Sequence, residues 1–151
     1  DMNIAYFLLP KSRTAYLYDD YTVRQGLEKM RYHGYAAIPV ISREGKYMGT
    51  VSEGDFLWCL LSEEGGRHFT RSLKDLEKLR VRDLLCEDNA PPVGITVSME
   101  ELLTSAMNQN FVPVVDDLEN FIGIVTRKDI IRYFAEQNNP AAVTQRMRKI
   151  V

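Results

Sequence analysis

An internal repeat is the feature of this sequence that most constrains its fold. Residues 38–60, "IPVISREGKYMGTVSEGDFLWCL", align without a gap with residues 112–134, "VPVVDDLENFIGIVTRKDIIRYF". The apolar positions of the two segments coincide, which predicts two structural units of the same kind. Five pairs of positions at an offset of 74 residues carry identical or similar residues: Pro39 and Pro113, Gly49 and Gly123, Val51 and Val125, Ser52 and Thr126, Asp55 and Asp129.

Each copy has the pattern of a β-hairpin followed by a helix. Apolar runs rich in β-branched residues, separated by a polar turn, predict two neighbouring strands. The strands are expected at 37–41 and 47–51 in the first copy and at 112–115 and 121–125 in the second. The helices that follow are expected to begin at about residue 53 and about residue 127.

A second, amphipathic helix is predicted ahead of each hairpin. Thr22 lies three residues before Gln25, and Ser98 lies three residues before Glu101. A hydroxyl followed three residues later by Glu or Gln is the capping-box pattern that opens a helix. We therefore expect helices that begin just after Thr22 and just after Ser98.

The ends of these helices and the segments before them also correspond. Gly34 is placed to end the first helix in a left-handed conformation, and Asn108 or Asn110 to do so for the second. The apolar segments 4–9, "IAYFLL", and 81–86, "VRDLLC", occupy equivalent lead-in positions. Each unit thus reads as lead-in, strand, helix, strand, strand, helix.

These elements predict an α+β fold made of two β-α-β-β-α repeats. We place the first repeat at 4–61 and the second at 81–137. Residues 62–80 form a linker with a short helix expected near 72–80, and residues 138–151 form a C-terminal tail helix.

The overall composition is that of an ordinary globular protein. Hydrophobic residues make up 45% of the 151 residues and charged residues 26%, with a net charge of -2. This balance argues against disorder and against nucleic acid as a partner. The longest apolar runs are far shorter than the ~20 residues of a membrane-spanning helix, and the N-terminus does not resemble a secretory signal. We expect a cytoplasmic protein that does not bind a membrane.

No set of residues predicts an enzyme or a metal site. Catalysis needs a nucleophile with a base, a metal cluster, or two carboxylates with different roles. His33 and His68 lie far from the carboxylates in sequence, and we expect both on the surface. Cys59 and Cys86 match no zinc or disulfide pattern and are expected to be buried, and Trp58 is expected in the core or at a dimer contact.

The strand-to-helix junctions "GTVSEGD" and "GIVTRKD" allow two interpretations. Ser or Thr followed three residues later by Asp is close to an ordinary helix cap. The N-terminus of a helix also suits a phosphate, and a carboxylate can accept both hydroxyls of a ribose diol. The second interpretation predicts a nucleotide site.

The sequence resembles the tandem CBS domains, or Bateman module, found in regulatory proteins such as the gamma subunit of AMP-activated protein kinase. The resemblance covers about residues 4–137 and is carried by the "GYAAIPVI" and "FVPVV" strands, the two junctions and the "VRDLL" lead-in. It implies two repeats packed about a pseudo-twofold axis, with two clefts that hold adenine nucleotides. It also implies dimerisation into a disc.

The resemblance assigns a ligand-binding role to residues of both repeats. Ser52 and Asp55 would hold the ribose of the first cleft, and Thr126 and Asp129 that of the second. Phosphates would be met from the opposite repeat, by Arg127 and Lys128 in the first cleft, with Arg13 close by. The adenine slots would be formed in the first cleft by Thr14, Ala15, Tyr16, Tyr35, Ala36, Ala37, Ile38 and Pro39, and in the second by Pro92, Val93, Phe111, Val112 and Pro113.

The two clefts are expected to differ in strength. In the second cleft the phosphates would face Glu53 and Gly54, and a carboxylate repels a phosphate. We therefore expect the first cleft to be the stronger site, with Tyr35 stacking on the base. The segment before Pro113 is also shorter than its counterpart before Pro39.

A narrower resemblance points to a particular ligand. "SRTAYL", "GYAAIPV" and "TRKD" are similar to segments of small stand-alone CBS proteins of Gram-positive bacteria, some of which bind cyclic di-AMP; the matching positions are Arg13, Ala15, Tyr35 and Arg127. Asp55 and Asp129 instead suit a free ribose diol, which favours AMP, ADP or ATP.

The expected function is that of a nucleotide-sensing regulatory module without a catalytic cofactor. The nucleotide would change the arrangement of the module or of its homodimer, and an unidentified protein partner would sense that change. A cyclic di-AMP receptor and a ligand-free dimerisation module are the alternatives.

Overall fold

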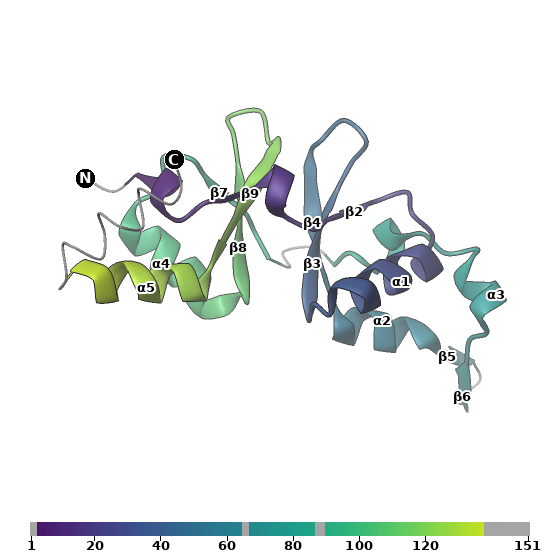
Figure 1. The fold of residues 1–151 in the computed structure, drawn as a ribbon. Helices are drawn as coiled ribbons and strands as arrows, with labels where there is room; N and C mark the ends of the chain where they lie inside the picture. The colour runs from purple at the N-terminus through teal and green to yellow at the C-terminus, as the bar shows by residue number, and fades with distance from the viewer. Residues whose placement is uncertain (1–2, 65–66, 87–89, 138–151) are drawn as a thin grey trace.

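The computed structural model describes residues 3–64, 67–86 and 90–137. The chain forms two α+β halves, with the sheets facing the middle of the molecule and the helices at its two ends (Figure 1). One sheet has four strands in the order β1-β9-β8-β7, and the other has three in the order β2-β3-β4. The predicted α+β class is confirmed.

The first half contains the first hairpin and its two helices. β2 (Leu17–Tyr18) runs parallel to β3 (Ala37–Ile41), which pairs antiparallel with β4 (Tyr47–Ser52). α1 (Val23–His33) and α2 (Glu53–Leu60) pack beside this sheet (Figure 1). The core of this half consists of Leu17, Val23, Met30, Ile38, Val40, Val51, Phe56, Cys59, Leu76 and Val81.

The second half repeats this arrangement. β7 (Val93–Gly94) runs parallel to β8 (Phe111–Val115), which pairs antiparallel with β9 (Phe121–Thr126). α4 (Met99–Asn108) and α5 (Arg127–Gln137) accompany the sheet. The four hairpin strands and the starts of α2 and α5 confirm the predicted positions to within one residue.

The two lead-in segments are exchanged between the halves. The 3₁₀ turn η1 (Ile4–Tyr6) and β1 (Leu9–Pro10) precede the first repeat, yet Ile4 lies in the core of the second half and β1 pairs with β9. The 3₁₀ turn η3 (Val81–Leu84) precedes the second repeat, yet Val81 lies in the core of the first half. Each half is therefore completed by a segment that lies before the other one in sequence.

A glycine in each second hairpin strand accommodates the exchanged segment. At Gly123, with φ +155°, an added Cβ would lie 2.2 Å from the carbonyl oxygen of Leu9 and 2.9 Å from a methyl carbon of Leu8. At Gly49, with φ +147°, an added Cβ would lie 3.0 Å from a methyl carbon of Leu85. Leu8 and Leu85 thus cover equivalent glycines in opposite repeats.

The first helix begins and ends as expected. The Thr22 hydroxyl accepts a hydrogen bond from the Gln25 backbone amide, and the Gln25 side chain accepts one from the Thr22 amide, so the capping box is confirmed. Gly34 ends α1 in the left-handed conformation, with φ 69°.

The second helix ends differently from the prediction. The Ser98 side chain caps α4, but Gln109 follows the helix in an extended conformation, and neither Asn108 nor Asn110 has a positive φ. The last carbonyls of α4 instead receive hydrogen bonds from the side chain of Arg127. The expectation of a left-handed asparagine is wrong because a side chain of the next helix satisfies these carbonyls.

The linker contains a hairpin that the sequence analysis did not foresee. β5 (Leu61–Glu64) pairs antiparallel with β6 (Arg67–Thr70) directly after α2. The linker helix α3 (Leu73–Leu76) is shorter than the expected 72–80 and begins after the capping residue Ser72. The predicted tail helix at 138–151 lies outside the described residues.

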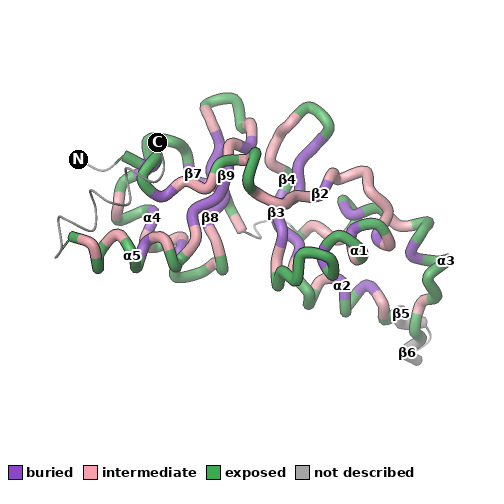
Figure 2. The backbone as a smooth tube through the Cα atoms, viewed as in Figure 1, coloured by how far each residue is buried: buried purple, intermediate pink, exposed green. Residues whose placement is uncertain are grey.

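The two halves meet along their hairpins. Backbone hydrogen bonds join Tyr47 N to Glu119 O and Phe121 N to Gly45 O. A third small core at this seam contains Ile41, Phe121 and Ile124. Figure 2 shows the buried stretches along the hairpin strands and the exposed ones on the helices.

The two cysteines and Trp58 lie in different environments. Cys59 is buried as expected, but Cys86 is exposed, because it follows the covering residue Leu85 rather than entering a core. Trp58 is 74% exposed and is therefore not a core residue; α2 buries Phe56 and Cys59 instead. No helix among the described residues is long and apolar enough to cross a membrane.

Candidate functional site

A polar hollow of about 180 Å³ lies between the two halves. Its walls come from the end of the first hairpin, from the turn between α4 and β8, and from the start of α5. The lining residues are Ala37, Thr50, Ser52, Ala90, Asn108, Gln109, Asn110, Phe111 and Arg127. Its volume is below the roughly 300–1,000 Å³ typical of small-molecule pockets, so a nucleotide would extend beyond it.

The guanidinium of Arg127 is anchored at one side of the hollow. Its Nε donates to the carbonyl oxygen of Ala106 at 2.6 Å, and its Nη2 donates to that of Met107 at 3.2 Å. A cation also interacts favourably with the negative C-terminal end of α4. A guanidinium has five N–H donors, so Arg127 retains donors for an anion while its position is fixed.

Gln109 presents an unusual acceptor. Its Nε2 donates to the carbonyl oxygen of Pro91 at 3.0 Å. Its Oε1 is buried and accepts no hydrogen bond from any residue that the structure describes. Buried polar atoms are nearly always paired, and exceptions are often functional.

Tyr47 supports the opposite wall of the hollow. Its hydroxyl donates to the carbonyl oxygen of Ala90 at 2.7 Å and lies 2.8 Å from the Thr50 hydroxyl. Burial raises the pKa of Tyr47 to about 12. Ala90 has φ 59°, a left-handed conformation that is costly for a residue other than glycine. The tyrosine thus holds a strained wall residue in place.

Both strand-to-helix junctions form the helix caps that the sequence suggested. Asp55 Oδ2 accepts hydrogen bonds from the Ser52 amide at 2.8 Å and from the Ser52 hydroxyl at 3.0 Å. The Thr126 hydroxyl donates to Asp129 Oδ2 at 2.7 Å. Asp55 itself is not among the residues that line the hollow, although its hydrogen-bond partner Ser52 is.

The same type of helix cap also occurs in the linker, outside the two hairpin junctions. Ser72 and Asp75 in the linker form the same reciprocal pair of hydrogen bonds at the start of α3. This helix belongs to neither hairpin and does not line the hollow. The cap geometry therefore identifies helix starts and does not by itself identify a nucleotide site.

The structure brings a few of the predicted site residues to the hollow. Ala37, Ser52 and Arg127 line it, together with Phe111 from the expected second adenine slot. Four others are buried within the hairpin strands: Ile38, Pro39, Val112 and Pro113. Lys128 is exposed and does not line the hollow, although it adjoins Arg127.

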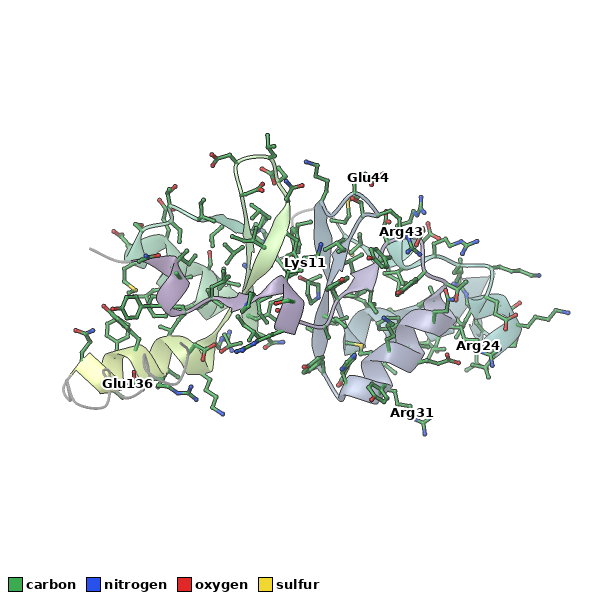
Figure 3. All side chains as sticks on the ribbon, turned by 45° about the horizontal axis from the view of Figure 1, so that its top comes forward. Lys11, Arg24, Arg31, Arg43, Glu44 and Glu136 are labelled. Carbon is green, nitrogen blue, oxygen red and sulfur yellow. The ribbon has the colours of Figure 1, made fainter. Side chains whose placement is uncertain are left out.

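The residues expected around the first base have other surroundings. The Thr14 hydroxyl donates to the Pro10 carbonyl at 2.9 Å, and Ala15 packs against the first core. The ring centres of Tyr16 and Phe121 lie 6.4 Å apart. The Nζ of Lys11, which Figure 3 labels between the two halves, lies 5.5 Å from the centre of the Tyr16 ring. Arg13 and Ala36 are exposed. None of these residues lines the inter-repeat hollow.

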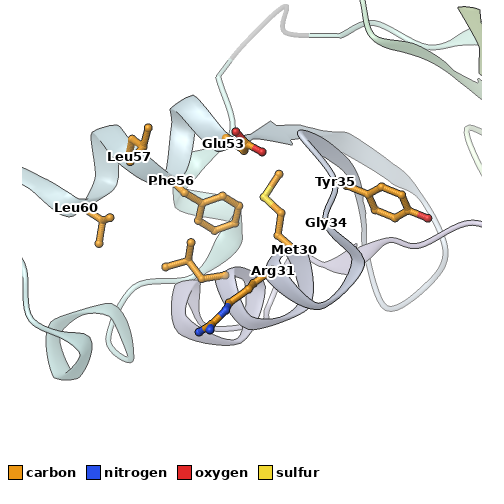
Figure 4. A pocket seen from close by; sticks show the side chains of 9 residues that line it. Met30, Arg31, Gly34, Tyr35, Glu53, Phe56, Leu57 and Leu60 are labelled. Atoms are coloured by element: carbon orange, nitrogen blue, oxygen red, sulfur yellow. The ribbon is translucent and has the colours of Figure 1, made fainter.

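Tyr35 lies at a different hollow. This one has a volume of about 350 Å³, lies between α1 and α2, and is lined mainly by apolar side chains such as Met30 and Phe56 (Figure 4). The Tyr35 ring stacks on His33 at 5.4 Å. Tyr35 therefore does not line the inter-repeat hollow, and its predicted stacking on a base stays a prediction.

Sequence reasoning missed several residues of the inter-repeat hollow. Gln109, Ala90 and Thr50 were not among the candidates. The offset of 74 that aligns the hairpins also aligns Tyr35 with Gln109, so extending the repeat backwards would have flagged this position. Among the described residues, no group of His, Cys, Asp and Glu is arranged to hold a metal ion.

Two sequence relatives match this chain over part of their length. The chain is 27% identical over 106 residues to the uncharacterized protein MJ1225 of Methanocaldococcus jannaschii, covering 68% of this chain and 37% of that protein. It is 28% identical over 103 residues to the L-aspartate semialdehyde sulfurtransferase of the same organism, covering 68% of this chain and 18% of that enzyme. The chain thus spans well under half of either relative.

Solved structures match over nearly the whole chain. CbpB of Listeria monocytogenes, solved in complex with c-di-AMP, superposes with a TM-score of 0.75 at 24% identity, covering 89% of this chain and 96% of that one. CBSX2, solved in complex with AMP, superposes with a TM-score of 0.70 at 22% identity, covering 92% of this chain and all 100% of that one. At these identities the likeness establishes the fold.

A family model establishes the relationship more directly. Residues 9–62 and 81–136 each match the CBS domain. Each stretch contains one of the two hairpins together with the helix before it and the helix after it. The chain therefore belongs to the CBS domain family and carries two CBS domains in tandem.

Proposed function

We propose that this protein is a regulatory module that binds an adenine nucleotide between its two CBS repeats. One observation carries the proposal: the hollow between the halves gathers an anchored guanidinium, Arg127, and an unpaired buried acceptor, Gln109. The first suits a phosphate and the second suits a base with an amino group. Two CBS-pair proteins of the same fold were solved with adenine nucleotides, which supports this ligand class.

The ligand we favour is AMP, ADP or ATP. Asp55 is hydrogen-bonded to Ser52, which lines the hollow, and its carboxylate suits a ribose diol. Cyclic di-AMP is the second candidate, supported by the c-di-AMP complex of CbpB. The roles of the remaining residues named from the family resemblance stay predictions.

The output is regulatory rather than catalytic. A ligand that touches both halves stabilises one arrangement of them over others, and a protein partner that prefers that arrangement reads the ligand's presence. The bound nucleotide thus acts as a signal and is not itself chemically converted.

Titration calorimetry of the intact chain with AMP, ADP, ATP, c-di-AMP and GMP tests the proposal. We expect binding of at least one adenine nucleotide and a weakening of about 10- to 100-fold in Arg127→Gln, since hydrogen bonds to charged groups are typically worth about 1.5–3 kcal/mol. Arg31→Gln, which removes an exposed cation on α1 away from the hollow, is the matched control and should bind as the parent does. Absence of binding to every adenine nucleotide would refute the proposal.

We also propose that the module forms a homodimer through its outer helices. Leu57 on α2 is 63% exposed and Ile131, its equivalent on α5, is 68% exposed. Trp58 and Phe134 extend this apolar surface. Large exposed apolar residues at matching positions favour burial against a second copy. Analytical ultracentrifugation should give a dimer that Leu57→Glu with Ile131→Glu dissociates; a monomeric parent would refute the dimer.

A further inference from the structure

We propose that Gln109 selects the base of the bound nucleotide by accepting a hydrogen bond from an exocyclic amino group, such as N6 of adenine. This inference rests on the proposed function, since it concerns the ligand of the same hollow. The counterpart of Gln109 in the first repeat is Tyr35. The two repeats would therefore offer different contacts to a base.

The orientation of the Gln109 amide is set by the protein. Nε2 donates to the carbonyl oxygen of Pro91 at 3.0 Å. Rotating the amide by half a turn would place two oxygens, both acceptors, against each other. The acceptor Oε1 is therefore kept on the side away from Pro91.

The protein offers Oε1 no donor of its own. The atom is buried, and no described residue donates to it. The side chain of Asn108, which precedes Gln109, donates its Nδ2 to the carbonyl of Thr104 at 3.0 Å. A donor brought by a ligand would satisfy a buried acceptor to which no described residue donates.

The surroundings suit a flat base. Ala37 and Ala90 line the hollow with small side chains, and Phe111 contributes an aromatic ring. Aromatic rings stack favourably on nucleobases. Arg127 also lines the hollow, so a base near Gln109 and a phosphate near Arg127 can belong to one molecule.

The chemistry predicts which bases are accepted. A 6-amino purine places a donor against Oε1, whereas a 6-oxo purine places an acceptor there. A purine with only hydrogen at this position leaves Oε1 unpaired. Leaving a buried acceptor unpaired typically weakens binding about 5- to 150-fold, so the preference should be easy to measure.

The experiment is a two-by-two comparison by calorimetry on the intact chain. The parent and Gln109→Met are each titrated with AMP and with purine riboside 5′-monophosphate, which lacks only the amino group. We expect the parent to prefer AMP by at least about fivefold, and Gln109→Met to lose most of this preference. Gln137→Met, the same change at an exposed glutamine that does not line the hollow, should keep the parent's preference.

The outcomes separate this inference from the proposed function. A parent that binds neither nucleotide overturns both. A parent that binds the two nucleotides equally overturns the inference alone, and this result does not depend on whether Gln109→Met folds. A preference that survives unchanged in Gln109→Met also overturns it, because a merely structural glutamine would weaken both ligands alike.

Discussion

Gly123→Ala tests the exchange of lead-in segments most directly. The new Cβ would lie 2.2 Å from the Leu9 carbonyl oxygen and 3.0 Å from the Pro10 Cα. Both are backbone atoms of β1, so no side-chain rotation relieves the overlap, and β1 has to move off β9. A forced contact in a packed region costs about 1–3 kcal/mol, and an alanine at φ +155° adds strain of about 1–3 kcal/mol.

The free energy of unfolding should therefore fall by about 2–6 kcal/mol. Urea titration followed by circular dichroism measures this loss. Limited proteolysis should also cut Gly123→Ala more readily within residues 3–10 than the parent, because β1 loses its pairing.

Two other glycines calibrate the result. At Gly49 the nearest atom is a methyl carbon of the Leu85 side chain, 3.0 Å away, which can rotate, so Gly49→Ala should destabilise less than Gly123→Ala. At Gly94 an added Cβ meets nothing within 4 Å, so Gly94→Ala should change stability by less than about 1 kcal/mol. A Gly123→Ala variant as stable as Gly94→Ala would show that β1 does not lie against β9 as described.

Two further predictions concern the walls of the hollow. Burial raises the pKa of Tyr47 to about 12, against about 10 in the unfolded chain. The contribution of Tyr47 to the free energy of unfolding is therefore fully present below about pH 10 and is lost between about pH 10 and 12. The stability difference between the parent and Tyr47→Phe, measured by urea unfolding, should therefore shrink from about pH 9 to about pH 11; a constant difference would contradict the raised pKa. Ser52→Ala and Ser72→Ala each remove a cap and should each cost about 1 kcal/mol, but only Ser52→Ala should weaken nucleotide binding in calorimetry; equal effects on binding would disconnect Ser52 from the site.

Much of the fold could be predicted because both repeats carry the same short-range sequence patterns. The hairpin strands and the helix starts at residues 53 and 127 depend on apolar periodicity and on caps within a few residues. The end of α4 could not be predicted in this way, because its carbonyls are satisfied by Arg127, which lies about twenty positions later. The exposure of Trp58 likewise depends on which face of α2 the first core uses.

The candidate site was less accessible to sequence reasoning. Ser52 and Arg127 were identified from their junctions, and the structure brings both to one hollow. The opposite wall depends on Ala90, whose strained backbone is held by Tyr47, a residue of the other repeat. A contact between residues so far apart in the chain produces no recognisable sequence pattern. The same is true of the unpaired oxygen of Gln109.

The crossed lead-ins also bear on how such a chain could have arisen. The lead-in of each repeat carries a leucine that packs on the glycine of the other repeat: Leu8 on Gly123, and Leu85 on Gly49. A single repeat would therefore leave its own glycine uncovered. In a pair of identical single-repeat chains, the lead-in of each chain would cover the glycine of the other, as in a domain-swapped dimer. The present chain is equivalent to such a pair after gene duplication and fusion, with one continuous backbone in place of two.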